Sequence, residues 1–373
     1  MHTELCDRFG IQYPIFVFTP SEKVAAAVTR AGGMGVLGAV RFNHPDELES
    51  VLCWMDDNTL GLPYGVDIVM PATVPTEGTP VDINKLIPQA HRDFVAKTLA
   101  DLGVPPLPGD GPGSEGVLGW LHSVARSHVD VALTHPIKLI ANALGSPPRD
   151  VIDQAHAAGV PVAALAGSAK HAVRHAEMGV DIVVAQGYEA GGHTGEIASM
   201  VLVPEVCDAV GDRAAVLAAG GIGSGRQVAA ALALGATGVW MGSAFLTAAE
   251  YDLGVHGTDG PSVIQEALLA ASSSDTVRRK IFSGKPARLL KSRWTDAWDA
   301  DDAPQALPMP LQNILVSEAH QRMSQSADPT TVAMPVGQIV GRMNEIRPVA
   351  DIMAELVSGF DEATGRLDGF RDH

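Results

Sequence analysis

Apolar and glycine positions recur along the chain in a pattern that predicts helices followed by short buried strands. A helical segment that ends in glycine and runs into a Val- or Ile-rich stretch appears at residues 27–39, 155–165, 175–185 and 231–241. Glycine just after a helix permits the left-handed conformation that ends it. The stretches are apolar without alternation, which is typical of parallel strands covered on both faces. The pattern therefore indicates consecutive right-handed βαβ units.

Counting these stretches predicts an α/β fold with eight strands, which is the number in a TIM (β/α)8 barrel. A doubly wound parallel sheet stays open as the alternative, because periodicity alone does not separate the two. The strands are expected at 14–18, 35–39, 64–69, 129–134, 160–165, 181–185, 214–218 and 238–241. Helices fit between them at about 21–31, 45–56, 114–127, 148–158, 169–178, 204–210 and 225–234.

Two segments are additional to the strands and helices of a barrel, and neither resembles an independent domain. Residues 71–113 follow the third strand as an insertion, with an amphipathic helix over 83–102 and then a stretch rich in glycine and proline. Residues 249–373 form an extension with two or three more helices. We therefore divide the chain into a barrel over 1–248 and a helical extension that packs on its active-site face. The insertion lies on a βα loop, so we expect it as a lid on the same face.

Composition and net charge limit the classes of molecule that the protein is expected to bind. The chain of 373 residues is 46% hydrophobic and 18% charged, as expected of a globular protein. A net charge of −17 argues against nucleic acid and anionic membranes, because both attract basic surfaces. The uncharged stretch 227–247 is interrupted by glycines, so it predicts helix, turn and buried strand rather than a membrane span.

The cysteines and the N-terminus indicate a cytoplasmic protein. Cys6, Cys53 and Cys207 are far apart and form no CxxC motif, which fits a reducing compartment and disfavours disulfides or a zinc site. The first ten residues lack the apolar core of a signal peptide. The acidic segment 299–304 is expected to be a solvated loop, and we expect no metal.

Two glycine-rich loops occupy the positions where barrels often bind phosphate, after strands seven and eight. The first reads AAGGIGSGRQ over 218–227 and leads into a helix, whose N-terminal dipole favours an anion. The second offers the Gly242 N–H and the Ser243 hydroxyl. Either loop alone is no more than a tight turn, but together they predict a phosphate site.

A third polar loop, AQGYEAGGHTG over 185–195, follows strand six. Glycines on both sides of His193 leave its imidazole accessible, and imidazole exchanges protons near neutral pH. We therefore predict His193 as the catalytic residue. Glu189 is either an acid or a brace for the backbone. His135 is placed at the end of strand four, on the active face, where it either takes part in chemistry or caps the strand.

These segments resemble the nitronate monooxygenase family, formerly called 2-nitropropane dioxygenases, which are FMN-dependent TIM-barrel oxidoreductases. Motifs of other enzyme classes, such as GxSxG, HExxH or a P-loop, are absent from the sequence. The resemblance covers most of the chain and is carried by residues 28–39, 185–195, 218–246, 282–288 and 336–341.

The resemblance implies one FMN and assigns residues to it. The phosphate would lie against Ala219, Gly220, Gly221, Gly242 and Ser243. Gln186 would contact the flavin, Gly192 would pack against it, and His193 would match the family's catalytic histidine. Thr19 and Pro20 stand where the family has an Ala-Pro-Met turn beside the flavin, and Asp67 stands in place of its usual Asn. Gln338 either reaches the same pocket or caps a helix.

The activity implied is oxidation of small alkyl nitronates by O2 to a carbonyl compound and nitrite. The alternative is an NAD(P)H-dependent FMN reductase of an enone, quinone or acyl-thioester, for which Lys138, Arg149 or Arg288 would meet a CoA-like group. A flavin-free aldolase or isomerase barrel would need a Schiff-base lysine or paired carboxylates at strand ends, and none is placed there. A non-catalytic FMN-binding protein and a homodimer both stay open.

Overall fold

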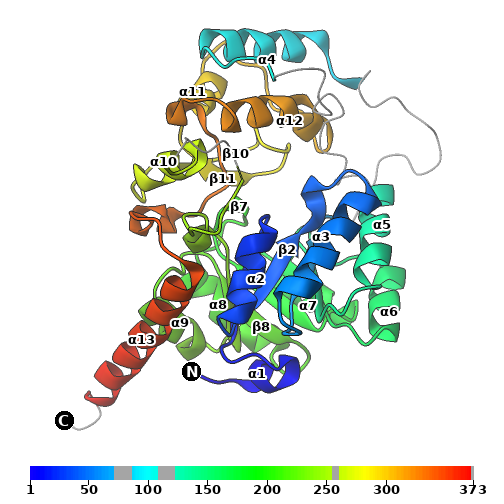
Figure 1. The fold of residues 1–373 in the computed structure, drawn as a ribbon, viewed down its shortest axis with the longest axis vertical. Coiled ribbons are helices and arrows are strands. Elements are labelled where there is room, and N and C mark those ends of the chain that lie inside the picture. Colours follow the sequence, from blue (N-terminus) through cyan, green and yellow to red (C-terminus); the bar gives the residue numbers. More distant parts are fainter. Residues whose placement is uncertain (71–85, 108–121, 254–259, 371–373) are drawn as a thin grey trace.

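Eight parallel strands close into a barrel in the computed structural model, which describes residues 1–70, 86–107, 122–253 and 260–370 (Figure 1). This confirms the predicted TIM barrel and excludes the doubly wound sheet. The strands follow one another around the barrel in the order β1-β2-β3-β4-β5-β6-β8-β9. They are β1 Ile15–Thr19, β2 Met34–Gly38, β3 Gly65–Ile68, β4 Leu139–Asn142, β5 Val162–Ala166, β6 Ile182–Gln186, β8 Ala215–Ala219 and β9 Gly238–Met241.

Helices surround the barrel and extend beyond it. Those of the N-terminal part are α1 Glu4–Phe9, α2 Glu22–Arg30, α3 Pro45–Asn58, α4 Gln89–Asp101, α5 His122–Ala132, α6 Arg149–Ala157, α7 Ala169–Glu177, α8 Ser199–Val210 and α9 Gly225–Ala233. The C-terminal part has α10 Val263–Leu269, α11 Arg293–Trp298, α12 Leu311–Ser324 and α13 Val349–Asp368. Short 3-10 turns are η1 Ala39–Arg41, η5 Ser243–Phe245, η6 Pro329–Thr331 and η7 Gln338–Arg342.

The barrel interior is a packed core. Side chains from alternate positions of the strands fill it, among them Phe16, Val36, Leu139, Val184 and Leu217, all 0% exposed. The positions between them face outward and meet the surrounding helices in two further apolar clusters. A strand buried on both faces has no polar side to show, which is why the strand stretches are apolar throughout.

The predicted fourth strand, over 129–134, is wrong. Residues 129–132 form the last turn of α5 and 133–134 follow it in a turn, and the strand itself is the four-residue β4 Leu139–Asn142. Ala125, Val129 and Ala132 are buried at spacings of four and three, which is a helical face. The β-branched residues around Val129 therefore line one side of a helix rather than a strand.

A second, three-stranded antiparallel sheet ties the extension to the barrel. It has the order β10-β11-β7, with β10 Thr276–Arg279, β11 Ala287–Leu290 and β7 Gly192–His193. The extension thus contains four helices and two strands in its described part, more than the two or three helices expected. Figure 1 shows α10–α12 and β10–β11 lying over one end of the barrel, whereas α13 packs along its side against α9.

The insertion and the extension pack on each other. Much of the insertion, 71–85 and 108–113, lies outside the described residues, but α4 falls within the expected helix and covers α12 (Figure 1). Val95 and Leu99 of α4 share an apolar cluster with Trp298 and Val316. Segments more than 200 residues apart therefore build one cap.

The chain contains no helix, among those described, that is long and apolar enough to cross a membrane. The uncharged stretch 227–247 folds as predicted, with the end of α9, a turn and the buried strand β9.

Close contact between α9 and α13 generates a stability prediction. A Cβ on Gly225 would collide with the backbone of Leu356, Gly359 and Phe360 in α13. Gly225→Ala should therefore lower the free energy of unfolding by roughly 1–3 kcal/mol, as overpacking does. Gly365→Ala is the matched control, because a Cβ there meets nothing within 4 Å. It should leave stability unchanged or raise it by up to about 1 kcal/mol. Urea unfolding measures both, and equal effects would contradict the tight contact.

Candidate functional site

A cavity of about 320 Å3 lies at the carboxyl ends of the barrel strands. This is the end at which TIM-barrel enzymes place their active sites. Every residue that was assigned to catalysis or to the cofactor, except Thr19, lines this cavity, which we call the inner cavity. They are Pro20, Asp67, Gln186, Gly192, His193, Ala219, Gly220, Gly221, Gly242 and Ser243.

Thr19 does not line the inner cavity, although it was predicted with Pro20. It is the last residue of β1 and is 2% exposed. Its hydroxyl accepts a hydrogen bond from the Ser21 N–H at 3.1 Å, at the start of α2. Phe18 and Pro20 line the cavity on either side of it. Thr19 therefore fixes the backbone of the turn rather than meeting a ligand with its side chain.

The two glycine loops meet at the inner cavity. Gly220 and Gly221 have φ angles of 98° and 71°, a region that favours glycine. This conformation turns the chain sharply after β8, and no backbone acceptor is described for either N–H. The Ser243 hydroxyl accepts a hydrogen bond from the Gly337 N–H at 2.9 Å and keeps its own proton to donate. The loops thus present donors of the kind that bind phosphate.

Asp67 forms part of the cavity floor. It lies on β3, is 1% exposed, and its Oδ2 has no hydrogen-bond partner among the described residues. Burial raises the pKa of this carboxyl well above its ordinary value, because no nearby cation or donor stabilises the charged form. The protonated acid can donate a hydrogen bond to a ligand carbonyl, as an Asn amide would.

Glu189 is a brace. Its carboxylate accepts hydrogen bonds from the Ser199 N–H at 3.0 Å and from the Ser199 hydroxyl at 3.0 Å, at the start of α8. A carboxylate near a helix N-terminus is favourable. Its backbone carbonyl also accepts from the Gln338 N–H at 2.9 Å. The side chain of Gln338 is not among those lining the inner cavity, whereas its neighbours Gly337 and Ile339 are.

His193 is held by the extension. As part of β7 it pairs with Ala287 of β11. Its Nε2 lies 2.6 Å from the hydroxyl of Ser283, a residue that is 0% exposed. Burial, with a smaller effect from the Lys285 charge, lowers the pKa of His193 to about 4. The imidazole is therefore neutral at neutral pH.

The Ser283 hydroxyl fixes the orientation of the imidazole. Its Oγ accepts from the Lys285 N–H at 3.3 Å and lies 2.6 Å from His193 Nε2, and it can donate to that nitrogen or accept from it. A neutral imidazole held in one orientation has one unprotonated nitrogen and is suited to accept a proton.

Several lining residues escaped prediction because they come from distant segments. Phe282, Met334 and Pro335 close one side of the inner cavity from the extension. Ser283 was also missed as a partner of His193. Its segment, 282–288, stood out only through family resemblance, and no periodicity placed it beside a loop 90 residues earlier.

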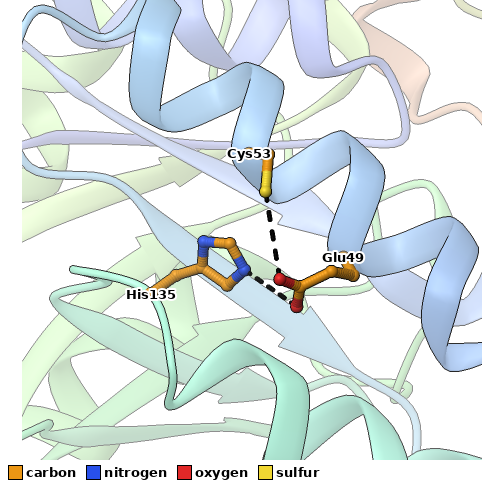
Figure 2. A group of neighbouring side chains, drawn as sticks. All are labelled: Glu49, Cys53 and His135. Carbon is orange, nitrogen blue, oxygen red and sulfur yellow. Dashed lines mark hydrogen bonds and ion pairs between the residues drawn. The ribbon is translucent and has the colours of Figure 1, made fainter.

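The predicted position of His135 is wrong. It lies before β4 rather than after it, so it is at the opposite end of the barrel from the inner cavity. Figure 2 shows it beside Glu49 and Cys53 of α3. Its Nδ1 lies 2.7 Å from Asp56 and its Nε2 lies 3.1 Å from Glu49. Burial opposes protonation, but these two hydrogen bonds raise the pKa of His135 overall. Glu49, Cys53 and His135 have atoms able to bind a metal within 4.8 Å of one another, but the ion pairs of His135 with Glu49 and Asp56 account for this grouping.

The basic residues proposed for a CoA-like group are also dispersed. Lys138 precedes β4 and lines a surface pocket with Arg8 at the far end of the barrel. Arg149 is exposed and pairs with Asp153 at 2.9 Å. Arg288 is 2% exposed and donates to the Tyr188 carbonyl at 3.0 Å. They form no common patch.

The inner cavity fits a flavin nucleotide in its donors and shape. The glycine loops supply backbone N–H groups for a phosphate, and the positive φ angles leave room where side chains would stand. The orphaned carboxyl of Asp67 and the amide of Gln186 offer polar partners for a ring edge. Apolar residues, including Leu165, Ile222 and Trp240, make the remaining wall.

Comparison with known proteins points to one family. The model of the nitronate monooxygenase family matches residues 2–359. A putative monooxygenase of Mycobacterium tuberculosis is 46% identical over 99% of each chain. The structure of nitroalkane oxidase from Streptomyces ansochromogenes is 28% identical, covers 97% of this chain and 99% of that one, and has a TM-score of 0.78. FabK from Thermotoga maritima is 27% identical over 99% of each chain, with a TM-score of 0.74.

The buried carboxyl of Asp67 generates a pH prediction. Because its pKa is raised in the folded state, the folded protein binds more protons than the unfolded chain above pH ~4. Its contribution to stability is therefore lost as pH rises. Asp67→Asn, which is neutral at every pH, should match the wild type near pH 4 and exceed it increasingly towards pH 7.

Urea unfolding of the flavin-free protein at several pH values measures this difference, whose slope is at most about 1.4 kcal/mol per pH unit. Asp302→Asn, at an exposed position, is the control and should show no such slope. A gap between Asp67→Asn and wild type that stays constant with pH would show that Asp67 is ionised in the fold.

Proposed function

Since the chain belongs to the nitronate monooxygenase family and is a flavin-dependent oxidoreductase, we propose that it binds FMN and oxidises alkyl nitronates with O2. The products would be a carbonyl compound and nitrite. One observation carries this proposal: a neutral imidazole, His193, faces the same cavity as two glycine loops suited to one phosphate. The single phosphate favours FMN over a dinucleotide.

The residues of the inner cavity have different proposed roles in binding the cofactor. Gly220, Gly221, Gly242 and Ser243 would hold the phosphate through backbone and hydroxyl donors. Asp67, as a neutral acid, would donate to a polar atom of the flavin ring, and Gln186 would lie against the same ring. FMN supplies the redox chemistry when bound.

His193 is the proposed proton acceptor. The unprotonated nitrogen of its ring would take the α-proton of a neutral nitroalkane, or position a nitronate that arrives already deprotonated. Ser283 orients the ring through Nε2, and burial keeps the ring neutral until the pH approaches 4. Apolar walls around it exclude water from the reacting carbon.

The insertion and the extension would set the substrate. We infer that residues 1–248 form the flavin-binding unit and that 249–373 complete it, because β11 fixes His193 and Phe282 closes the cavity. The α4 segment of 71–113 covers the extension rather than the cavity directly.

A spectrum tests the cofactor and the redox partner. The purified protein, mixed with FMN, should show bound flavin absorption near 450 nm and lose it anaerobically on addition of a nitronate. Restoration of the absorption by O2 completes the cycle. A protein that binds no FMN refutes the proposal. Bleaching by NADPH but not by a nitronate would instead favour a reductase of enones, quinones or thioesters.

Replacing His193 tests its role as proton acceptor. His193→Asn should lower kcat/KM for a neutral nitroalkane by about 10²–10⁴-fold, the usual contribution of a general base. The preformed nitronate needs no deprotonation, so its kcat/KM should fall much less. His171→Asn, at an exposed position on α7, is the control. Equal losses with both substrates would show that His193 only shapes the cavity.

A further inference from the structure

A second cavity, of about 500 Å3, adjoins the inner cavity. We call it the outer chamber. Its walls come from η1 and the start of α3, from one face of α12, and from residues 332–335. Val40, Phe282, Met334 and Pro335 line both spaces. The two spaces are therefore neighbours across a wall of four side chains.

Phe282 stands between the proposed proton acceptor and the outer chamber. Its ring centroid is 6.5 Å from that of His193. On the other side it stacks on His320 of α12, with centroids 5.2 Å apart and planes at 17°. A molecule whose reactive carbon lies at His193 would thus pass Phe282 to reach His320.

The face of α12 that lines the outer chamber is polar. Asn313, Ser317, His320, Gln321 and Ser324 share it, at helical spacing. Asn313 is only 4% exposed, yet its side chain makes no hydrogen bond within the described structure, and its Oδ1 is buried without a partner. His320 Nε2 is in the same situation. Buried polar groups in folded proteins are nearly always hydrogen-bonded, so a missing partner is indicated.

The opposite wall offers a further donor but little net charge. Arg41 Nε is buried without a partner, while its Nη2 lies 2.5 Å from Glu22. Glu47 accepts hydrogen bonds from the backbone at the start of α3. Burial lowers the pKa of His320 to about 4, so the ring is neutral. The walls therefore favour a ligand that hydrogen-bonds without carrying charge.

We propose that the outer chamber binds an uncharged hydrogen-bonding tail, an amide or a hydroxyl, of an elongated substrate whose reactive carbon lies at His193. The Nδ2 of Asn313, for which no hydrogen-bond partner is described, would donate to the carbonyl or hydroxyl oxygen of this tail. The inference rests on the proposed function and names its substrate class. Nitronates with a polar tail would be preferred to simple alkyl nitronates.

Two substrates of equal chain length test the tail. They are the nitronates of 1-nitrooctane and of N-butyl-3-nitropropanamide, in which one amide replaces two methylenes. The wild-type holoenzyme should turn over the amide with a kcat/KM at least about fivefold higher, as expected for one added hydrogen bond. A value equal to or below that of the alkyl nitronate overturns the proposal.

Substitutions in the outer chamber test whether the preference for the amide substrate arises there. Asn313→Leu and His320→Phe remove the unpaired polar atoms and should reduce the amide-to-alkyl ratio by about five- to tenfold. Glu318→Gln, on the exposed side of the same helix, should keep the wild-type ratio. Having two variants guards against one that fails to fold, and bound-flavin absorption reports the fold of each. Unchanged ratios in both folded variants would refute the site.

A binding measurement separates this inference from the proposed function. N-butylpropanamide, which lacks the nitro group, should perturb the flavin spectrum of the wild type, with a Kd raised at least about fivefold in Asn313→Leu. That result supports the outer chamber even if no nitronate is oxidised. Turnover of both nitronates without an amide preference would leave the function standing and reject the tail site.

Discussion

The antiparallel pairing of β7 with β11 is the constraint on which the site depends. Gly192 pairs with Arg288 and His193 with Ala287, so the loop after β6 is fixed by a strand of the extension. The same segment brings Ser283 within 2.6 Å of His193. A glycine-rich loop alone would leave the imidazole without a defined orientation. The extension therefore helps to build the candidate site rather than packing on the barrel as a separate unit.

The barrel could be predicted because its strands obey a local rule. A strand buried on both faces must be apolar, and a short connection must turn at glycine, so seven of the eight strands were located from sequence. β4 was missed because the preceding helix carries a stretch with a more β-like composition. Tertiary packing of Val129 against the barrel decides that segment, and a local pattern does not show it.

Site residues could be predicted only where the geometry of the barrel brings them together. The carboxyl ends of parallel strands converge, so Gln186, Gly220 and Gly242 could be grouped from the order of the strands, whereas Asp67 was identified only through the family resemblance. Thr19 shows the limit, because neighbouring residues of a turn point in different directions. Phe282 and Met334 reach the cavity through contacts that no strand order specifies.

The two ionisable side chains singled out in the inner cavity share one electrostatic condition. Burial disfavours the anion of Asp67 and the cation of His193: it raises the pKa of the carboxyl and lowers that of the imidazole to about 4. Negative charge that enters with a phosphate or a nitronate therefore meets oriented N–H groups rather than fixed counter-ions. Such dipoles are strong in a water-poor cavity and need no reorganisation. A protein with a net charge of −17 can thus bind anions without a basic patch at the site.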